Sequence, residues 1–149
     1  MTQALNVDDL RSALPELTGT LRLRSLERPV DIYRDHLGIP HIRAQSVHDV
    51  LFAQGLAHAQ DCLWQMDYNR HRAYGRWAEL VGSVGLEQDL LLRRFRLWAS
   101  AQADYAAVNA ETRAMLDAYA AGVNAFLHST TRFPIEYRLV DTTPDPWQP

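Results

Sequence analysis

Apolar residues recur at helical spacing along one long stretch that contains no proline, residues 46–82. One stripe follows an i, i+4, i+7 pattern, and a second lies about 100° further round the helix. The first stripe consists of Phe52, Leu56, Ala59, Leu63 and Met66, and the second of Ala53, Ala57 and Trp64. Because a surface helix needs only one apolar face, this pattern predicts a central helix that is buried on more than one side.

The central helix carries signals at both ends. Ser46 can cap the first turn, and Asp49 can bond back to the backbone, as in a capping box. Gly75 is expected to break the helix, and a short helix over residues 76–81 is expected to end at Gly82. A third strip of small residues predicts that another backbone approaches closely, and it contains Gly55, Cys62 and Ala73.

Before the central helix, the pattern has a period of two. Residues 19–26 alternate between apolar and polar side chains, which predicts a half-exposed strand. Residues 30–34 and 40–44 predict a β-hairpin whose loop contains Gly38. A short amphipathic helix is expected over residues 7–14.

After the central helix, residues 86–108 predict one helix, and Asn109 is a candidate N-cap for another over residues 110–127. Gly122 inside the latter predicts close helix packing. Its expected buried face contains Leu116, Tyr119, Ala120, Val123 and either Phe126 or Leu127. Residues 133–140 predict a last strand.

The predicted fold is mainly α with a short N-terminal β-hairpin, in a single domain over residues 1–149. Strands occupy residues 19–44, a helical core residues 46–128, and an irregular tail residues 129–149. An isolated hairpin is marginal in water, and its edges need pairing. We therefore expect a partner that completes both the sheet and the core.

Composition and charge narrow the class of protein. The formal net charge of −3 gives no reason to expect a nucleic-acid partner. No apolar run approaches the roughly 18 residues of a membrane span, so no membrane partner is expected. The N-terminus lacks the pattern of a secretory signal, which favours a cytoplasmic location. Cys62 is the sole cysteine, so no intrachain disulfide can form, and a small buried residue is expected there.

Five sequence blocks occur in a specific order and spacing. They are Arg34-Asp35 with Gly38 and Pro40-His41-Ile42; Gly55, Ala57, Ala59-Gln60-Asp61 and Leu63-Trp64-Gln65-Met66-Asp67; Gly75, Ala78-Glu79 and Gly82; Tyr119-Ala120 and Gly122-Val123-Asn124; and Pro146-Trp147. From about residue 19 to the C-terminus, the chain resembles the α subunit of the penicillin acylase family of N-terminal nucleophile hydrolases.

The resemblance implies a precursor that cuts itself into α and β chains, which share a four-layer αββα fold as an αβ heterodimer. The first residue of the β chain, usually serine, is the nucleophile, and its own α-amino group is the base. An amine with an ordinary pKa near 7.7–8.0 suits that role at neutral pH. The reaction is hydrolysis of a small acyl-amide. Substrates across the family include β-lactam antibiotics, acyl-homoserine lactones and lipopeptides.

One departure from the family concerns the end of the chain. The family's α chain continues past the Pro-Trp pair into a helix that lines the acyl pocket and can supply a calcium ligand, whereas this sequence stops at Pro149. A trimmed or partial α subunit is therefore expected. We expect no cofactor in this chain, with calcium left to the complete αβ enzyme, and no substrate-binding residue is assigned.

Several polar residues that could belong to a functional site are better explained by structural roles. His58 and Asp61 lie i, i+3 apart, but two ligands are too few for a metal site, so a satisfied polar stripe is expected. His41 is expected to be a buried, hydrogen-bonded hairpin residue. Arg34 and Asp35 should face opposite ways on a strand. Buried backbone groups are the expected partners of Gln60, Asp61 and Asn124.

No residue of the chain is assigned a catalytic or metal-binding role. None of the serines stands in a nucleophile-elbow or S-x-x-K context: Ser12, Ser25, Ser46, Ser83, Ser100 and Ser129. Two hypotheses remain. The chain is either the α subunit of an amide hydrolase, inactive on its own, or a non-catalytic helical interaction module derived from the same family.

Overall fold

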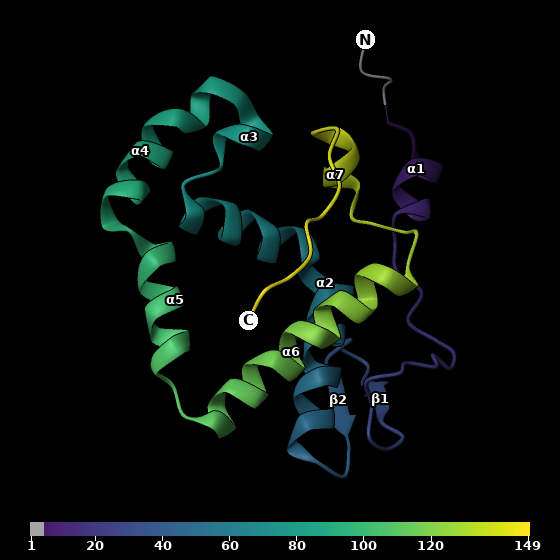
Figure 1. The fold of residues 1–149 in the computed structure, drawn as a ribbon. Helices are drawn as coiled ribbons and strands as arrows, with labels where there is room; N and C mark the ends of the chain where they lie inside the picture. The colour runs from purple at the N-terminus through teal and green to yellow at the C-terminus, as the bar shows by residue number, and fades with distance from the viewer. Residues whose placement is uncertain (1–4) are drawn as a thin grey trace. The chain divides into compact units, whose positions relative to one another are not determined.

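The structure is a computed structural model, and it describes residues 5–149 (Figure 1). It is mainly helical with one antiparallel two-stranded hairpin, as the sequence predicts. In chain order the elements are α1 (Val7–Ser12), β1 (Asp31–Arg34), β2 (Pro40–Arg43), α2 (Val47–Tyr74), α3 (Ala78–Val81), the 3-10 helix η1 (Gly82–Gly85), α4 (Leu86–Phe95), α5 (Leu97–Ala107), α6 (Ala110–Ser129) and α7 (Ile135–Leu139). Within the described residues, no helix is both long and apolar enough to cross a bilayer.

The described residues fall into two compact units. The hairpin unit consists of residues 15–61, 109–131 and 145–149, and the α4 unit of residues 5–14, 62–108 and 132–144. Helix α2 contributes to both, and its backbone leaves the helical conformation at Cys62, with φ −146° and ψ 32°. Cys62 is half-buried rather than buried.

The predicted hairpin is confirmed in the hairpin unit. Ile32 pairs with Ile42 and Tyr33 with His41 across the two strands. Gly38 adopts a φ of 79°, which glycine reaches without a steric penalty, and its amide donates to the Asp35 carbonyl oxygen at 2.9 Å. The hairpin is therefore set by its turn as well as by its strand pattern.

Helices α2 and α6 pack closely in the hairpin unit (Figure 1). A Cβ at Gly55 would overlap the Tyr119 carbonyl, and one at Gly122 would overlap the Phe52 carbonyl, which confirms both predicted close approaches. The buried α2 stripes are confirmed at Phe52, Ala53, Leu56, Ala57, Ala59 and Leu63, whereas Met66 and Trp64 are half-buried. Ala118, Ala120, Val123 and Phe126 form the buried side of α6.

Two predictions for the α6 face are wrong in detail. Leu116 is 38% exposed, and Tyr119 is half-buried. The predicted N-cap is confirmed, because the Asn109 side chain accepts a 2.8 Å bond from the Thr112 amide. Ala120, Val123 and Phe126 are buried as predicted, so the helical register is right, but the buried face excludes Leu116.

The predicted strand over residues 19–26 is wrong, since this segment is irregular in the structure. Its continuation is anchored to α2 by Asp49, whose carboxylate accepts 3.0 Å bonds from the Glu27 and Arg28 amides. The Ser46 cap is confirmed by a 3.1 Å bond from the Asp49 amide. The Asp49 carboxylate therefore binds the backbone of a distant segment, whereas the sequence predicted a bond to the start of its own helix.

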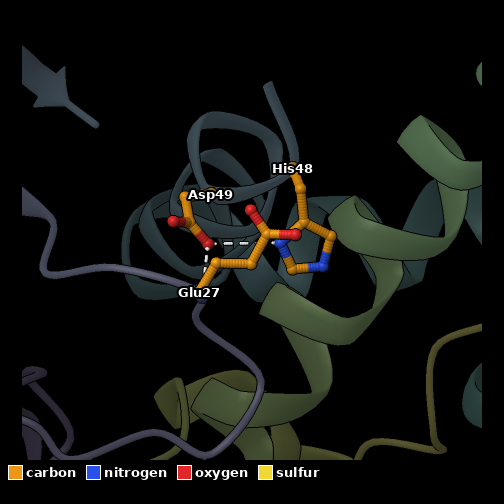
Figure 2. A group of neighbouring side chains, drawn as sticks. All are labelled: Glu27, His48 and Asp49. Atoms are coloured by element: carbon orange, nitrogen blue, oxygen red, sulfur yellow. Dashed lines mark hydrogen bonds and ion pairs between the residues drawn. The ribbon is translucent and has the colours of Figure 1, made fainter. Parts of the chain in front are cut away.

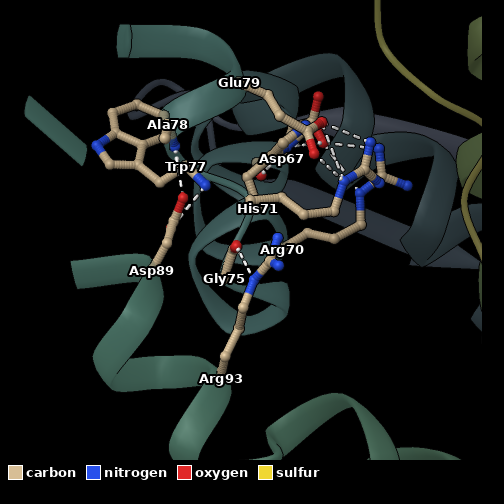
Figure 3. Close-up of polar contacts among 10 residues, drawn as sticks. Asp67, Arg70, His71, Gly75, Trp77, Ala78, Glu79, Asp89 and Arg93 are labelled. Atoms are coloured by element: carbon tan, nitrogen blue, oxygen red, sulfur yellow. Dashed lines mark hydrogen bonds and ion pairs between the residues drawn. The ribbon is translucent and has the colours of Figure 1, made fainter. Parts of the chain in front are cut away.

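Gly75 ends α2 with a φ of 63° in the α4 unit, as predicted. A Cβ there would lie 2.6 Å from Cγ of Arg93, and Arg93 Nε donates to the Gly75 carbonyl oxygen at 2.8 Å (Figure 3). The short helix that follows begins at Ala78, two residues later than predicted. Gly82 is its C-cap at a φ of 74°.

The single helix predicted over residues 86–108 is broken. Arg96 has left-handed backbone angles, φ 52° and ψ 38°, and separates α4 from α5. Large apolar side chains along this stretch are exposed, with Leu91 51% and Phe95 63% exposed. These two helices therefore bury little of their apolar surface within the α4 unit.

The strand predicted over residues 133–140 is wrong, because the structure has helix α7 there. Pro134 precedes the first helical residue, a position where its missing N–H costs no helical hydrogen bond. Tyr137 is buried, and its ring packs edge-to-face against Trp64 with centroids 5.1 Å apart. Helix α7 thus serves to place one aromatic residue in the core of the α4 unit.

Candidate functional site

Arg34 joins the hairpin to the first half of α2. Its guanidinium makes a two-pronged contact with the Asp61 carboxylate, at 2.9 Å and 2.8 Å, and reaches Gln60 Oε1 at 3.4 Å. It also donates to the Gly38 carbonyl oxygen at 3.1 Å. The predicted backbone-holding role of Gln60 and Asp61 is therefore wrong, because both bind a guanidinium.

Asp35 organises the hairpin turn. Its carboxylate accepts bonds from the Leu37 and Ile39 amides and lies 3.1 Å from His41 Nε2. The bond to His41 is the main cause that lowers the pKa of Asp35. As predicted, Arg34 and Asp35 have separate partners. His41 is hydrogen-bonded as expected, but the prediction that it is buried is wrong: its imidazole is exposed and stacks on Tyr33.

His58 and Asp61 also have separate partners. His58 Nδ1 lies 2.9 Å from the Tyr119 hydroxyl of α6, whereas Asp61 faces Arg34. This matches the predicted polar stripe. Asn124 holds the tail in the predicted way, accepting from the Trp147 amide at 2.7 Å and donating to its carbonyl oxygen at 2.9 Å.

A buried polar cluster occupies the α4 unit (Figure 3). Asp67 is 1% exposed and binds Arg70 at 2.6 Å and His71 at 3.1 Å. The Tyr137 hydroxyl donates to its other carboxylate oxygen at 2.9 Å. Asp67 stands in one of the five sequence blocks, whereas its partner Tyr137 lies outside them and 70 residues away, so spacing alone could not join the two.

Asp67 and His71 tune each other's protonation. Burial would raise the pKa of Asp67, but hydrogen bonds from His71, Arg70 and Tyr137 outweigh it, so that pKa is lowered. The bond to Asp67 raises the pKa of His71. Burial, and next the Asp67 charge, raise the pKa of Tyr137. A buried carboxylate with three donors is stabilised in its charged form, which suits a structural anchor rather than a reactive group.

Asp89 is a second anchor of the α4 unit. Its buried carboxylate accepts bonds from the Trp77 amide at 2.8 Å and the Ala78 amide at 2.7 Å, at the start of α3 (Figure 3). The sequence does not predict this role for Asp89, because nothing in the local pattern of a helix indicates that one of its aspartates binds a backbone amide eleven residues earlier.

The serines with hydrogen bonds serve the backbone. Ser12 and Ser129 donate to carbonyl oxygens of their own helices, at 2.8 Å and 3.2 Å, and Ser46 caps α2. Nucleophilic catalysis needs a hydroxyl in reach of a base. In the bonds described here each of the three hydroxyls contacts a backbone group.

One further group is assembled by the fold. Glu27, His48 and Asp49 each bring a potential ligand atom within 4.8 Å of the other two (Figure 2). His48 and Asp49 lie in the first turn of α2, and Glu27 lies in the irregular segment that Asp49 anchors. No local pattern predicts this group, because Glu27 lies next to a segment expected to be a strand, 21 residues before His48 and 22 before Asp49.

Comparison with known proteins finds relatives that are named as acylases. It is 46% identical over its full length to penicillin acylase 2 proenzyme from Pseudomonas sp. (strain SE83), covering 20% of that protein. It is 35% identical over 95% of its length to acyl-homoserine lactone acylase QuiP from Pseudomonas aeruginosa, covering 17% of it. The chain thus spans about a fifth of the length of the curated relatives it matches.

A solved structure and a family model agree with this placement. A thermostable penicillin G acylase from Alcaligenes faecalis matches with a TM-score of 0.73 and 33% identity, over 80% of this chain and 66% of that one. The penicillin amidase family model matches residues 29–149, which contain all five sequence blocks. The chain therefore belongs to the penicillin amidase family.

Proposed function

We propose that this chain is the α-subunit part of an amide hydrolase that removes an acyl group from an amine, with the nucleophile on a separate β chain. The observation that carries the proposal is the family match over residues 29–149, together with relatives named as acylases. The chain corresponds to about a fifth of those relatives, which leaves most of the enzyme to other residues.

The chemistry in this proposal belongs to the β chain. Its N-terminal serine attacks the amide carbonyl carbon, and its own α-amino group takes the hydroxyl proton and passes it to the departing amine. Water then hydrolyses the acyl-serine ester. Such an amine titrates near neutral pH and needs no residue of the α chain as base. The α chain's role is to supply helices and a hairpin that support the β chain.

The polar anchors support a scaffolding role. Arg34 ties the hairpin to α2, Asn124 holds the tail, and Asp67 secures α7. Each anchor uses a residue of a family block to fix backbone or side chains of this chain. A scaffold that must present a rigid surface to a second chain needs anchors of this kind.

Calcium belongs to this proposal only through the complete enzyme. Ca²⁺ takes six to eight oxygen ligands. The buried carboxylate of Asp67 does not fit such a site, because it is paired with the positively charged Arg70 guanidinium. We assign any calcium ligands of the enzyme to residues outside this chain.

The test starts from the whole precursor. We expect it to be cleaved into two chains, the second beginning with serine, and to hydrolyse acyl-amides of graded acyl length. Replacing that serine by alanine should abolish hydrolysis, and isolated residues 1–149 should show none above a blank. An uncleaved, folded and inactive protein would support the interaction module instead. Hydrolysis by residues 1–149 alone would contradict the proposal.

A further inference from the structure

Two carboxylates and one imidazole meet at the N-terminal turn of α2: those of Glu27, Asp49 and His48 (Figure 2). Asp49 is fully buried, His48 is half-buried, and Glu27 is exposed. An ion could therefore reach the group from solvent on the Glu27 side while being held on the protein side by Asp49. All three residues belong to the hairpin unit.

The pair at the base of the group has the spacing of two ligands of one ion. His48 Nδ1 and Asp49 Oδ1 are 3.2 Å apart. Zinc binds nitrogen and carboxylate oxygen at about 2.0–2.2 Å, so neighbouring donors in a tetrahedral or octahedral site lie roughly 2.9–3.4 Å apart. An ion bound to both atoms would lie off the line that joins them and would replace their hydrogen bond, with the exposed Glu27 side chain moving in as a third ligand.

The Asp49 carboxylate is oriented in advance. Its Oδ1 accepts from the Glu27 amide and its Oδ2 from the Arg28 amide, each at 3.0 Å. Hydrogen bonds of this outer kind fix a ligand's direction and add to metal affinity. Each carboxylate oxygen has two lone pairs, so Oδ1 keeps one for an ion after the bond from the Glu27 amide.

We propose that Glu27, His48 and Asp49 form a binding site for a divalent transition-metal ion of the zinc type, with water completing its coordination. An imidazole nitrogen beside two carboxylates favours zinc over calcium or magnesium, which take oxygen ligands. Two carboxylates also balance the ion's charge. The bound ion clips the segment around Glu27 to the start of α2.

The test uses the whole protein that carries this chain, stripped with chelator and titrated with zinc. We expect His48→Ala and Glu27→Gln to lose one zinc per chain at micromolar concentration, or to weaken its binding roughly tenfold or more. His36→Ala, at an exposed histidine of the hairpin turn, is the matched control and should bind as the unchanged protein does. Cobalt(II) absorption in the visible range gives a second readout of nitrogen and oxygen ligation.

Glu27→Gln protects the test against misfolding, because it changes an exposed side chain by one charge. Circular dichroism of each stripped variant checks its fold. In the unchanged protein, zinc should also slow hydrogen exchange at the Glu27 and Arg28 amides, and this slowing should vanish in both variants. Equal zinc uptake by the unchanged protein and both variants, or no zinc uptake by the unchanged protein, would overturn the proposal.

Discussion

Gly122 of α6 lies directly against the backbone carbonyl of Phe52 in α2, at a distance that leaves no room for a Cβ. Gly55 makes the reciprocal approach to the Tyr119 carbonyl. The two glycines let two helix backbones touch, and they come from different sequence blocks that the family match contains. Helix contact in the hairpin unit therefore depends on the absence of two side chains.

Gly122→Ala should destabilise the protein. If Gly122 did not contact α2, alanine would stabilise the helix by about 1 kcal/mol relative to glycine. The sign of the change in the free energy of unfolding therefore shows whether the contact exists. Overpacking typically costs about 1–3 kcal/mol, which should outweigh that gain. Chemical denaturation of the whole protein measures the change. A variant more stable than the original would show that the helices do not meet at this residue.

Leu63→Ala should cost about 2–5 kcal/mol, the range for large-to-small changes in a core. Leu63 is 1% exposed and lies on the predicted buried stripe of α2. Leu14→Ala is the matched control, because Leu14 is 62% exposed and lies outside the apolar surface of α4 and α5. A loss below about 1 kcal/mol for Leu63→Ala in the assembled protein would mean that the face is misplaced.

Stability should depend on pH through Asp67 and His71. The raised pKa of His71 adds stability that is complete below its ordinary value of 6.5 and is lost as pH rises through the folded value. The lowered pKa of Asp67 adds stability that is present above 3.8 and is lost as pH falls through the folded value. The Asp67–His71 pair therefore stabilises the fold most between pH 3.8 and pH 6.5.

His71→Gln should accordingly cost about 1.5–3 kcal/mol near pH 6, the value of a hydrogen bond to a charged group, and less near pH 9. Denaturant unfolding at both pH values measures this difference. His128→Gln, at an exposed residue of α6, is the control and should change little at either pH. An equal loss for His71→Gln at both pH values would contradict a protonated partner of Asp67.

Asn124→Ala should release the tail at Trp147. The variant loses both bonds to the Trp147 backbone, at a cost of about 1–3 kcal/mol for the groups left without partners. Hydrogen exchange at the Trp147 amide should become faster, whereas Asn69→Ala, at an exposed position of α2, should leave it unchanged. Unaltered exchange in the Asn124 variant would show that other contacts hold the tail.

Periodicity and caps predicted the elements whose signals are local. The buried stripes of α2, the Ser46 and Asn109 caps, the Gly38 turn and the Gly75 break all depend on residues within one or two turns of chain. The same reasoning placed a strand at residues 19–26, where alternation was present but a pairing partner was not. A period of two describes only how side chains alternate between two faces, whereas a β-strand also needs a neighbouring strand that pairs with its backbone.

The remaining features depend on distant residues. Arg96 breaks a helix without a glycine or proline to mark the site. Asp49 was expected to bond within its own turn, but it holds Glu27 and Arg28, and Asp67 meets Tyr137 of a segment that was read as a strand. The polar groups of the candidate site are assembled by the same long-range contacts, so sequence spacing alone could not reveal them.

The proposed function requires that this chain shares its core with a β chain and does not complete it alone. The exposed apolar residues of α4 and α5 support this proposal within their unit, and they include Leu86, Leu90, Leu91, Phe95 and Leu97. Obligate interfaces bury roughly 2,000–5,000 Å² of total accessible surface. The most direct measurement is light scattering of residues 1–149 expressed alone, compared with the same residues co-expressed with the rest of the precursor. We predict aggregation or self-association of the isolated chain and a defined αβ heterodimer on co-expression, whereas a monodisperse monomer of residues 1–149 would contradict the claim.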